Sequence, residues 1–124
     1  MNLPQFREIK SITAEIQIWA FEDDTLPVRE NITIASADIS SFPIAKGTIM
    51  AIDSSSKLAG EYTDGDPKYG TAYGILDEEI VEDAIGSTPQ NVMAIVGTMG
   101  TVYESKLTGI DANGKADMPQ IKFI

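Results

Sequence analysis

The 124-residue sequence contains no cysteine and no histidine. The absence of cysteine excludes disulfide bonds and thiolate nucleophiles, and the absence of both residues excludes a Cys/His zinc site. Without histidine, neither a Ser-His-Asp triad nor an imidazole base can form. Any acid–base chemistry would therefore have to come from carboxylates, lysine, tyrosine or the backbone.

Positive charge is scarce as well. The 9 Lys and Arg residues face 19 Asp and Glu residues, which gives a net charge of −10 and a pI near 4.2. Because a strongly acidic surface repels the phosphates of nucleic acids and anionic lipids, we expect no nucleic acid and no membrane as a partner. No apolar run approaches the ~18 residues of a membrane span, and the first residues lack the apolar core of a secretory signal.

Long amphipathic helices are also missing, since no apolar stripe with helical spacing persists over a dozen residues. Short alternating or apolar segments take their place, separated by Gly, Pro, Asp and Asn. They lie at residues 12–21, 28–36, 47–52, 71–76, 92–96 and 120–124. The pattern predicts a mostly β domain, a small sandwich or barrel of short strands with one or two short helical turns, one of them at 103–107.

Glycines and turn-forming residues give local expectations. Gly74, inside a predicted strand, indicates a bulge or a close backbone contact. Residues 53–57 and 111–114 are predicted turns, because Asp, Asn and Ser side chains bond to nearby backbone N–H groups. Gly97 and Gly100 are expected to turn the chain directly after its most apolar strand.

The N-terminal region is expected to differ from the rest. Residues 1–10 show no period and contain Pro4, which is typical of an extended arm. We therefore divide the chain into an arm with a pairing strand at 1–20 and a single mostly β domain at 21–124. Trp19, the only tryptophan, is an interface anchor if it is exposed and a core residue if it is buried.

One acidic cluster is a candidate for chemistry: Asp77, Glu78, Glu79, Glu82 and Asp83. Its carboxylates could pair as acid and base or bind a divalent cation. A hydrolase would need two acids held close together, with the pKa of one of them raised. A charge run without a partner motif is usually a solvated loop, which is what we expect here.

Residues 64–66 and 111–114 resemble fragments of calcium-binding loops. An EF-hand loop needs Gly at its sixth position and Glu at its twelfth. Counted from Asp111, Gly114 falls at the fourth position, and Phe123 and Ile124 surround the place of the Glu. The match fails and turn chemistry explains both stretches. We therefore expect no metal, no other cofactor and no catalytic residues.

Three tyrosines, Tyr62, Tyr69 and Tyr73, lie in a Gly-rich stretch in the middle of the chain. They could form an aromatic strip that contacts carbohydrate or protein, or they could pack the faces of a β-hairpin. The sequence leaves both interpretations open.

From Lys46 onward, short motifs follow one another in a distinctive order. The strand KGTIM at 46–50 leads to a Ser-rich turn ending in Lys57-Leu58, and a Gly/Asp-rich loop precedes TAYGILDE at 71–78. The apolar strand at 92–96 then leads to GTVYESKL at 100–107. This order, over 42–109, resembles the lambda-type bacteriophage head decoration proteins. In that family a strand and a Ser/Thr-rich turn ending in Lys-Leu precede a loop and an Ala-x-Gly-Ile-Leu strand.

The resemblance implies a non-enzymatic virion protein with a small, mostly β fold, sometimes called a β-tulip. Family members sit as trimers on the outside of the expanded capsid, at three-fold and quasi-three-fold positions, and fasten major capsid protein subunits against DNA pressure. It implies two partners, the major capsid protein and the chain itself as a homotrimer, and a place on the capsid exterior after synthesis in the host cytoplasm. Family members often end in an Ala/Lys-rich helix, whereas Pro119 here leaves room only for a very short one.

In this family the N-terminal arm orders on the shell and pairs with capsid segments. We hypothesise that five apolar residues of the N-terminal segment contribute to the capsid contact: Phe6, Ile9, Ile12, Ile16 and Trp19. The competing interpretation is that the strand at 12–20 is only a core strand of the subunit. The alternative function is a β-sandwich binding module of a phage tail or cell-surface protein, which would recognise carbohydrate or protein through the tyrosines.

Overall fold

The structure is a computed structural model that describes residues 17–20, 28–82, 84–85 and 88–124. Strands make up 43% and helices 12% of the structure, and five of the strands close into a barrel. The expected mostly β, barrel-like fold class is therefore confirmed. The elements, with 3-10 helices labelled η, are β1 (Trp19–Ala20), β2 (Val28–Ile34), η1 (Ser36–Asp38), β3 (Ile49–Ile52), β4 (Ala59–Glu61), β5 (Ala72–Leu76), β6 (Ala84–Ile85), β7 (Thr88–Pro89), β8 (Val92–Val102), η2 (Glu104–Lys106), α2 (Ala112–Asp117) and β9 (Ile121–Phe123).

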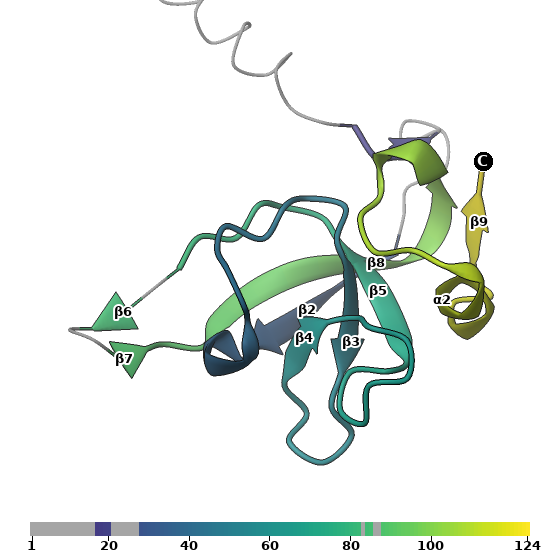
Figure 1. The fold of residues 1–124 in the computed structure, drawn as a ribbon. Helices are drawn as coiled ribbons and strands as arrows, with labels where there is room; N and C mark the ends of the chain where they lie inside the picture. Colours follow the sequence, from purple (N-terminus) through teal and green to yellow (C-terminus); the bar gives the residue numbers. More distant parts are fainter. Residues whose placement is uncertain (1–16, 21–27, 83, 86–87) are drawn as a thin grey trace, which may run out of the picture.

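The barrel has the strand order β8-β2-β4-β3-β5 and closes where β5 pairs with β8. Neighbouring strands run antiparallel except β2 and β4, which run parallel and meet at Ile34 and Ala59. Figure 1 shows β8 curving along the barrel and continuing toward α2 and β9. There its last residues pair with both β1 and β9. The long strand β8 therefore joins the barrel to a smaller outer layer made of β1, α2 and β9.

Two apolar clusters stabilise this arrangement. The interior cluster takes buried side chains from all five barrel strands, among them Ile32, Ile34, Met50, Ala59, Leu76, Ala94 and Val96. The outer cluster packs the barrel wall against the outer layer and includes Trp19, Ile49, Ala51, Tyr69, Ile75, Val102, Met118 and Ile121. Because successive side chains of a strand point to opposite faces, β3 contributes Met50 to the interior cluster and its neighbours Ile49 and Ala51 to the outer one.

The predicted turn at Gly97 and Gly100 is wrong, because β8 continues through both residues to Val102. A Cβ atom at Gly97 would overlap the indole ring of Trp19, which lies against the strand at this point. Glycine is needed here for a close approach of the ring and not for a turn. The predicted close contact at Gly74 is confirmed, since a Cβ atom there would lie 3.0 Å from the carbonyl oxygen of Gly97.

Most other local predictions that fall on described residues are confirmed. The strands predicted at 28–36, 71–76 and 120–124 and the helical turn at 103–107 are present, with bounds that differ by a few residues. The turn predicted at 111–114 is wrong, because these residues form the beginning of α2 and its N-cap. The side chain of Asp111 accepts a hydrogen bond from the N–H of Gly114 at 2.7 Å and so caps the helix. With six residues, α2 is as short as Pro119 led us to expect.

The end of the predicted arm belongs to the folded domain. Ile18 and Trp19 are buried, and β1 pairs with the end of β8. The domain boundary expected at residue 20 therefore falls after a strand that is already part of the sheet. Residues 1–16, which include most of the predicted arm, lie outside the described residues.

Candidate interaction site

One end of the barrel carries polar side chains where the interior cluster stops. Alternation places Glu30 on the same face of β2 as the buried residues Ile32 and Ile34. Glu30 is nevertheless exposed, so the barrel opens to solvent at this point. We call the end formed by Glu30, Tyr73 and Thr98 the barrel mouth.

Two β-bulges bring side chains to Glu30. The register between β3 and β5 skips Tyr73, and the register between β2 and β8 skips Thr98, so each is the extra residue of its bulge. A bulge changes the direction of a side chain relative to the regular strand. The hydroxyl of Tyr73 donates a hydrogen bond to Oε1 of Glu30, and that of Thr98 donates to Oε2 at 3.3 Å. The two irregularities thus converge on one carboxylate.

A cavity of about 300 Å³ adjoins these three residues. Its other walls come from Ala72 and from the segment 117–120, which joins α2 to β9. Asp117 is held at the end of α2 because its Oδ2 accepts a hydrogen bond from the backbone N–H of Ala72 at 3.0 Å. The cavity therefore has carboxylates from two separate elements, Glu30 and Asp117, together with apolar surface.

The barrel mouth is electronegative. None of the described residues that line the cavity is a lysine or an arginine. The hydrogen bond to Glu30, together with partial burial, raises the pKa of Tyr73, so its phenol stays protonated and keeps donating at neutral pH. Arg29, the neighbour of Glu30, forms an ion pair with Asp77 instead of entering the cavity. This arrangement suits a positively charged ligand.

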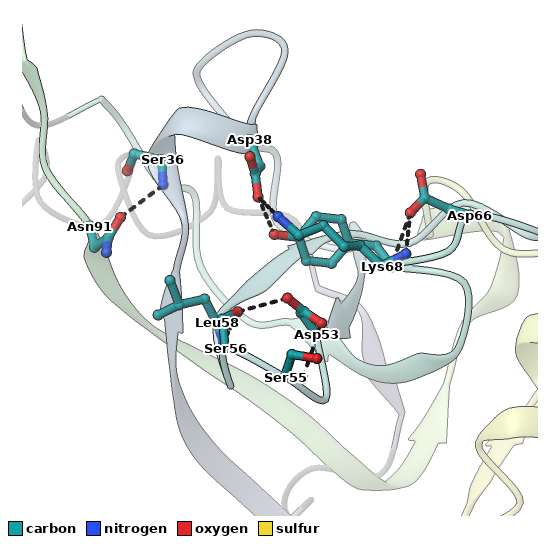
Figure 2. A network of polar contacts seen from close by, with 10 residues as sticks. Ser36, Asp38, Asp53, Ser55, Ser56, Leu58, Asp66, Lys68 and Asn91 are labelled. Carbon is teal, nitrogen blue, oxygen red and sulfur yellow. Dashed lines mark hydrogen bonds and ion pairs between the residues drawn. The ribbon is translucent and has the colours of Figure 1, made fainter.

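A second polar network fixes the loop that precedes β5, as Figure 2 shows. Asp38 on η1 accepts hydrogen bonds from the Tyr69 hydroxyl at 2.5 Å and from Lys68 Nζ at 3.1 Å, which lower the pKa of Asp38. Asp66 accepts from the backbone N–H groups of Lys68 and Tyr69, both at 2.8 Å. Burial and the bond to Asp38 raise the pKa of Tyr69. The network closes the loop onto the barrel wall and leaves Tyr69 packed in the outer cluster.

The Ser-rich turn between β3 and β4 is held in a similar way. Asp53 Oδ1 accepts from the N–H of Ser55 at 3.1 Å, and its Oδ2 accepts from the hydroxyl of Ser56 at 2.9 Å. The backbone N–H of Lys57 donates to the carbonyl oxygen of Asp53 at 2.8 Å. The predicted turn at 53–57 is therefore present, and its acidic residue has a structural role.

The tyrosines do not form an exposed strip. Tyr62 and Tyr69 are 6% and 8% exposed, and their hydroxyls donate to Asp111 and Asp38. Of the three, Tyr73 alone is substantially exposed, at 38%. The packing interpretation is the one that the structure supports for Tyr62 and Tyr69. A carbohydrate site built on all three tyrosines loses two of its contact residues.

The acidic segment at 77–82 is tied to the barrel. Asp77 accepts a hydrogen bond from Nε1 of Trp19 at 2.9 Å, and Glu78 accepts from the backbone N–H of Ile95 at 3.0 Å. Within the described ranges, no three acidic side chains gather as a metal site would require. Asp83 lies outside those ranges.

The hypothesised capsid-contact residues are not brought together by the described structure. Phe6, Ile9, Ile12 and Ile16 lie outside the described residues. Trp19 is 1% exposed and belongs to the outer cluster, so its side chain is not available to a partner. For Trp19, the interpretation as a core residue is the one that the structure supports.

The outer face of β8 carries exposed apolar side chains. Met93 is 67% exposed and Ile95 is 39% exposed, and they pair across to Thr33 and Asn31 on β2. The sequence held a signal for this surface, since the run at 92–96 is apolar at every position although one face of a barrel strand points outward.

Sequence reasoning did not single out Glu30 or Asp117. A signal for Glu30 was present, because a charged residue occupies the face of β2 that Ile32 and Ile34 place inside. Asp117 has no comparable signal, since its position depends on how α2 folds back to the N–H of Ala72.

In the part of the chain that the structure describes, no helix is long and apolar enough to cross a membrane. Comparisons of the sequence with protein-family models and with curated proteins found no match.

Proposed function

We propose that this chain is a structural virion protein that binds as a trimer to the outside of an expanded bacteriophage capsid. It occupies three-fold and quasi-three-fold positions and stabilises the shell by clamping major capsid protein subunits. In this role it is not an enzyme and needs no cofactor, and its partners are the major capsid protein and further copies of itself. It is made in the host cytoplasm and acts on the capsid exterior.

One observation carries this proposal: the motifs that resemble the decoration family fall on strands and a turn of one closed barrel and on the 3-10 helix that follows it. The motif at 46–50 leads into β3, and 53–58 forms the turn between β3 and β4. The motif at 71–78 contains β5, and 92–107 spans β8 and η2. Short motifs made of common residues carry more weight when they fall on the strands and turns of a single domain.

The position of β1 supports a role for the segment that precedes it. Ile18 is fully buried, and Nε1 of Trp19 donates a hydrogen bond to Asp77. These contacts fix the position of the chain at β1. Capsid strands that paired with residues 1–16 would gain backbone hydrogen bonds, with side-chain pockets selecting the partner. Ordering such a segment costs about 1–2 kcal/mol per residue, so the contact needs many pairings or several linked copies, which a trimer supplies.

The distribution of charge is compatible with an exterior position. A net charge of −10 would be unfavourable beside packaged DNA and is tolerated on the outer surface of a shell. Met93 and Ile95 on the outer face of β8 offer exposed apolar side chains for contact with another protein chain.

Co-sedimentation with expanded shells, assembled from the major capsid protein encoded in the same genome, tests the proposal. The full-length protein is expected to sediment with expanded shells. A protein that stays in the supernatant and binds glycans instead would contradict the decoration role and favour the alternative function.

A truncation tests the N-terminal segment separately. Removing residues 1–16 deletes Phe6, Ile9, Ile12 and Ile16 but keeps the buried residue Ile18 and the strand β1. We expect shell binding at least about tenfold weaker, with an unchanged unfolding midpoint. Undiminished binding would remove this segment from the contact while leaving the decoration role intact.

A further inference from the structure

We infer that the barrel mouth binds the guanidinium group of an arginine side chain on a partner protein. The cavity of about 300 Å³ lies at the open end of a β-barrel, which is a common position for ligand sites, and its size is at the lower end of their usual range. The inference goes beyond capsid binding and does not rest on it, because any protein that presents an arginine to the mouth would satisfy it.

Both carboxylates at the cavity have spare capacity to accept hydrogen bonds. The hydroxyls of Tyr73 and Thr98 each donate to one oxygen of Glu30, and a carboxylate oxygen can accept two bonds. Asp117 accepts the N–H of Ala72 through Oδ2, and within the described residues its Oδ1 has no hydrogen-bond partner. A guanidinium group has five N–H donors and no acceptor, so it matches this set.

The acceptors are fixed before a ligand arrives. The bulge residues Tyr73 and Thr98 hold Glu30 from two different strands, and the backbone of β5 holds Asp117. A site whose side chains are already ordered loses less conformational entropy when it binds. The two bulges are therefore better explained as positioning devices for Glu30 than as accidental irregularities of the barrel.

The remaining walls favour arginine over other cations. The exposed ring of Tyr73 offers a surface on which a planar guanidinium can stack, and the exposed residue Pro119 offers a contact to its aliphatic stem. A lysine ammonium lacks both the plane and the fork of donors. A calcium ion needs six to eight oxygen ligands. Ala72, Met118 and Pro119 contribute no side-chain oxygen to the cavity wall, so the wall does not suit calcium.

Electrostatics favours the same ligand at longer range. No lysine or arginine is among the described residues that line the cavity, and the whole chain carries a net charge of −10. Such a field draws positively charged groups toward the mouth before any contact forms.

An NMR titration with N-acetyl-arginine amide tests the inference on the full-length protein. We expect saturable shifts of the backbone amides of Tyr73, Thr98 and Gln120, with a dissociation constant in the millimolar range that is usual for so small a probe. N-acetyl-citrulline amide has nearly the same shape without the charge and is expected to leave these amides in place.

Two matched double variants separate the site from the general charge. Glu30→Gln with Asp117→Asn changes both cavity carboxylates. The amide of Gln at position 30 keeps one oxygen that can accept from Tyr73, while its NH2 group can donate to the hydroxyl of Thr98, and Asn at position 117 keeps an oxygen for the N–H of Ala72. Glu79→Gln with Glu82→Gln removes the same charge from exposed residues away from the cavity. The first pair is expected to weaken arginine binding at least about tenfold, and the second less than about twofold.

Four results would overturn the inference, and the last of them needs a further titration with N-acetyl-lysine amide. One is the absence of saturable shifts at the mouth, and another is an equal response to the citrulline probe. The third is an equal loss of affinity in both double variants, which would mean that the probe senses only the overall charge. Equal affinity for N-acetyl-lysine amide would contradict the preference for arginine. None of these results bears on shell binding, so failure here and failure of the proposed function are distinguishable.

Discussion

Tyr69 and Tyr73 lie in one short segment and each donates a hydrogen bond to a distant carboxylate, yet the two pairs have different roles. Tyr69 is 8% exposed, packs in the outer cluster and binds Asp38 in the network of Figure 2. Tyr73 is 38% exposed, sits at a β-bulge and binds Glu30 beside a cavity. A tyrosine–carboxylate hydrogen bond therefore stabilises the fold where the tyrosine is packed in a cluster, and it positions the carboxylate as an acceptor where the tyrosine is exposed to solvent.

Truncation to alanine should separate the two tyrosines most strongly. Tyr69→Ala is expected to lower the free energy of unfolding by about 3–5 kcal/mol, as for aromatic side chains removed from a core. Tyr73→Ala is expected to cost less than about 1 kcal/mol, since its ring is partly exposed. Urea unfolding followed by the fluorescence of Trp19 measures both. Similar losses in the two variants would break the comparison.

Removal of the hydroxyl alone isolates the hydrogen bonds. We expect Tyr69→Phe to lower the free energy of unfolding by about 1 kcal/mol, because a partly buried hydrogen bond is lost. For Tyr73→Phe the expected loss is a few tenths of a kcal/mol, since water can replace the phenol at Glu30. The same urea titrations measure this difference, and a larger loss in Tyr73→Phe would reverse the assignment of roles.

Alkaline pH should sharpen the same contrast. Burial, followed by the bond to a carboxylate, raises the pKa of Tyr69 and likewise that of Tyr62. A pKa raised above the unfolded value of about 10 contributes stability that is complete below pH ~10 and is lost as the pH rises through the folded-state pKa. We therefore expect stability to fall above pH ~10. As the pH rises above ~10, the thermal unfolding midpoint should fall less in Tyr69→Phe than in Tyr73→Phe. Equal falls of the midpoint in the two variants would contradict this account.

The acid side provides the smallest and most local test. The Tyr69 hydroxyl and Lys68 lower the pKa of Asp38, and backbone N–H groups of the same two residues lower that of Asp66. Such carboxylates contribute stability that is present above the unfolded pKa of about 3.9 and is lost as the pH falls through the folded-state value. Stability should therefore drop below pH ~4, less steeply in Asp38→Asn than in wild type. Glu79→Gln, at an exposed position, is the control and should keep the wild-type profile.

Local patterns were sufficient for the elements whose form depends on nearby residues. Alternation located the strand near 28–36, the end of a Gly-rich loop located the strand at 71–76, and Asp and Ser chemistry located the turn at 53–57. The turn predicted at Gly97 was wrong for a non-local reason, since the space that this glycine leaves is filled by Trp19 from β1. A Gly-rich stretch looks the same in sequence whether it turns the chain or admits a ring.

The barrel mouth was beyond local patterns for a related reason. A bulge is a property of two paired strands, so neither Tyr73 nor Thr98 could be recognised as an extra residue without knowing the register. Glu30 carried a partial signal in the alternation of β2. Asp117 reaches the cavity only through the contact of α2 with β5.

A three-dimensional reconstruction of expanded shells mixed with the full-length protein tests the central claim most directly. The decoration role predicts trimer density on the outer surface at the three-fold and quasi-three-fold positions, with a shape that accepts the barrel and its outer layer. Shells without added density at saturating protein, or density confined to other positions, would contradict it.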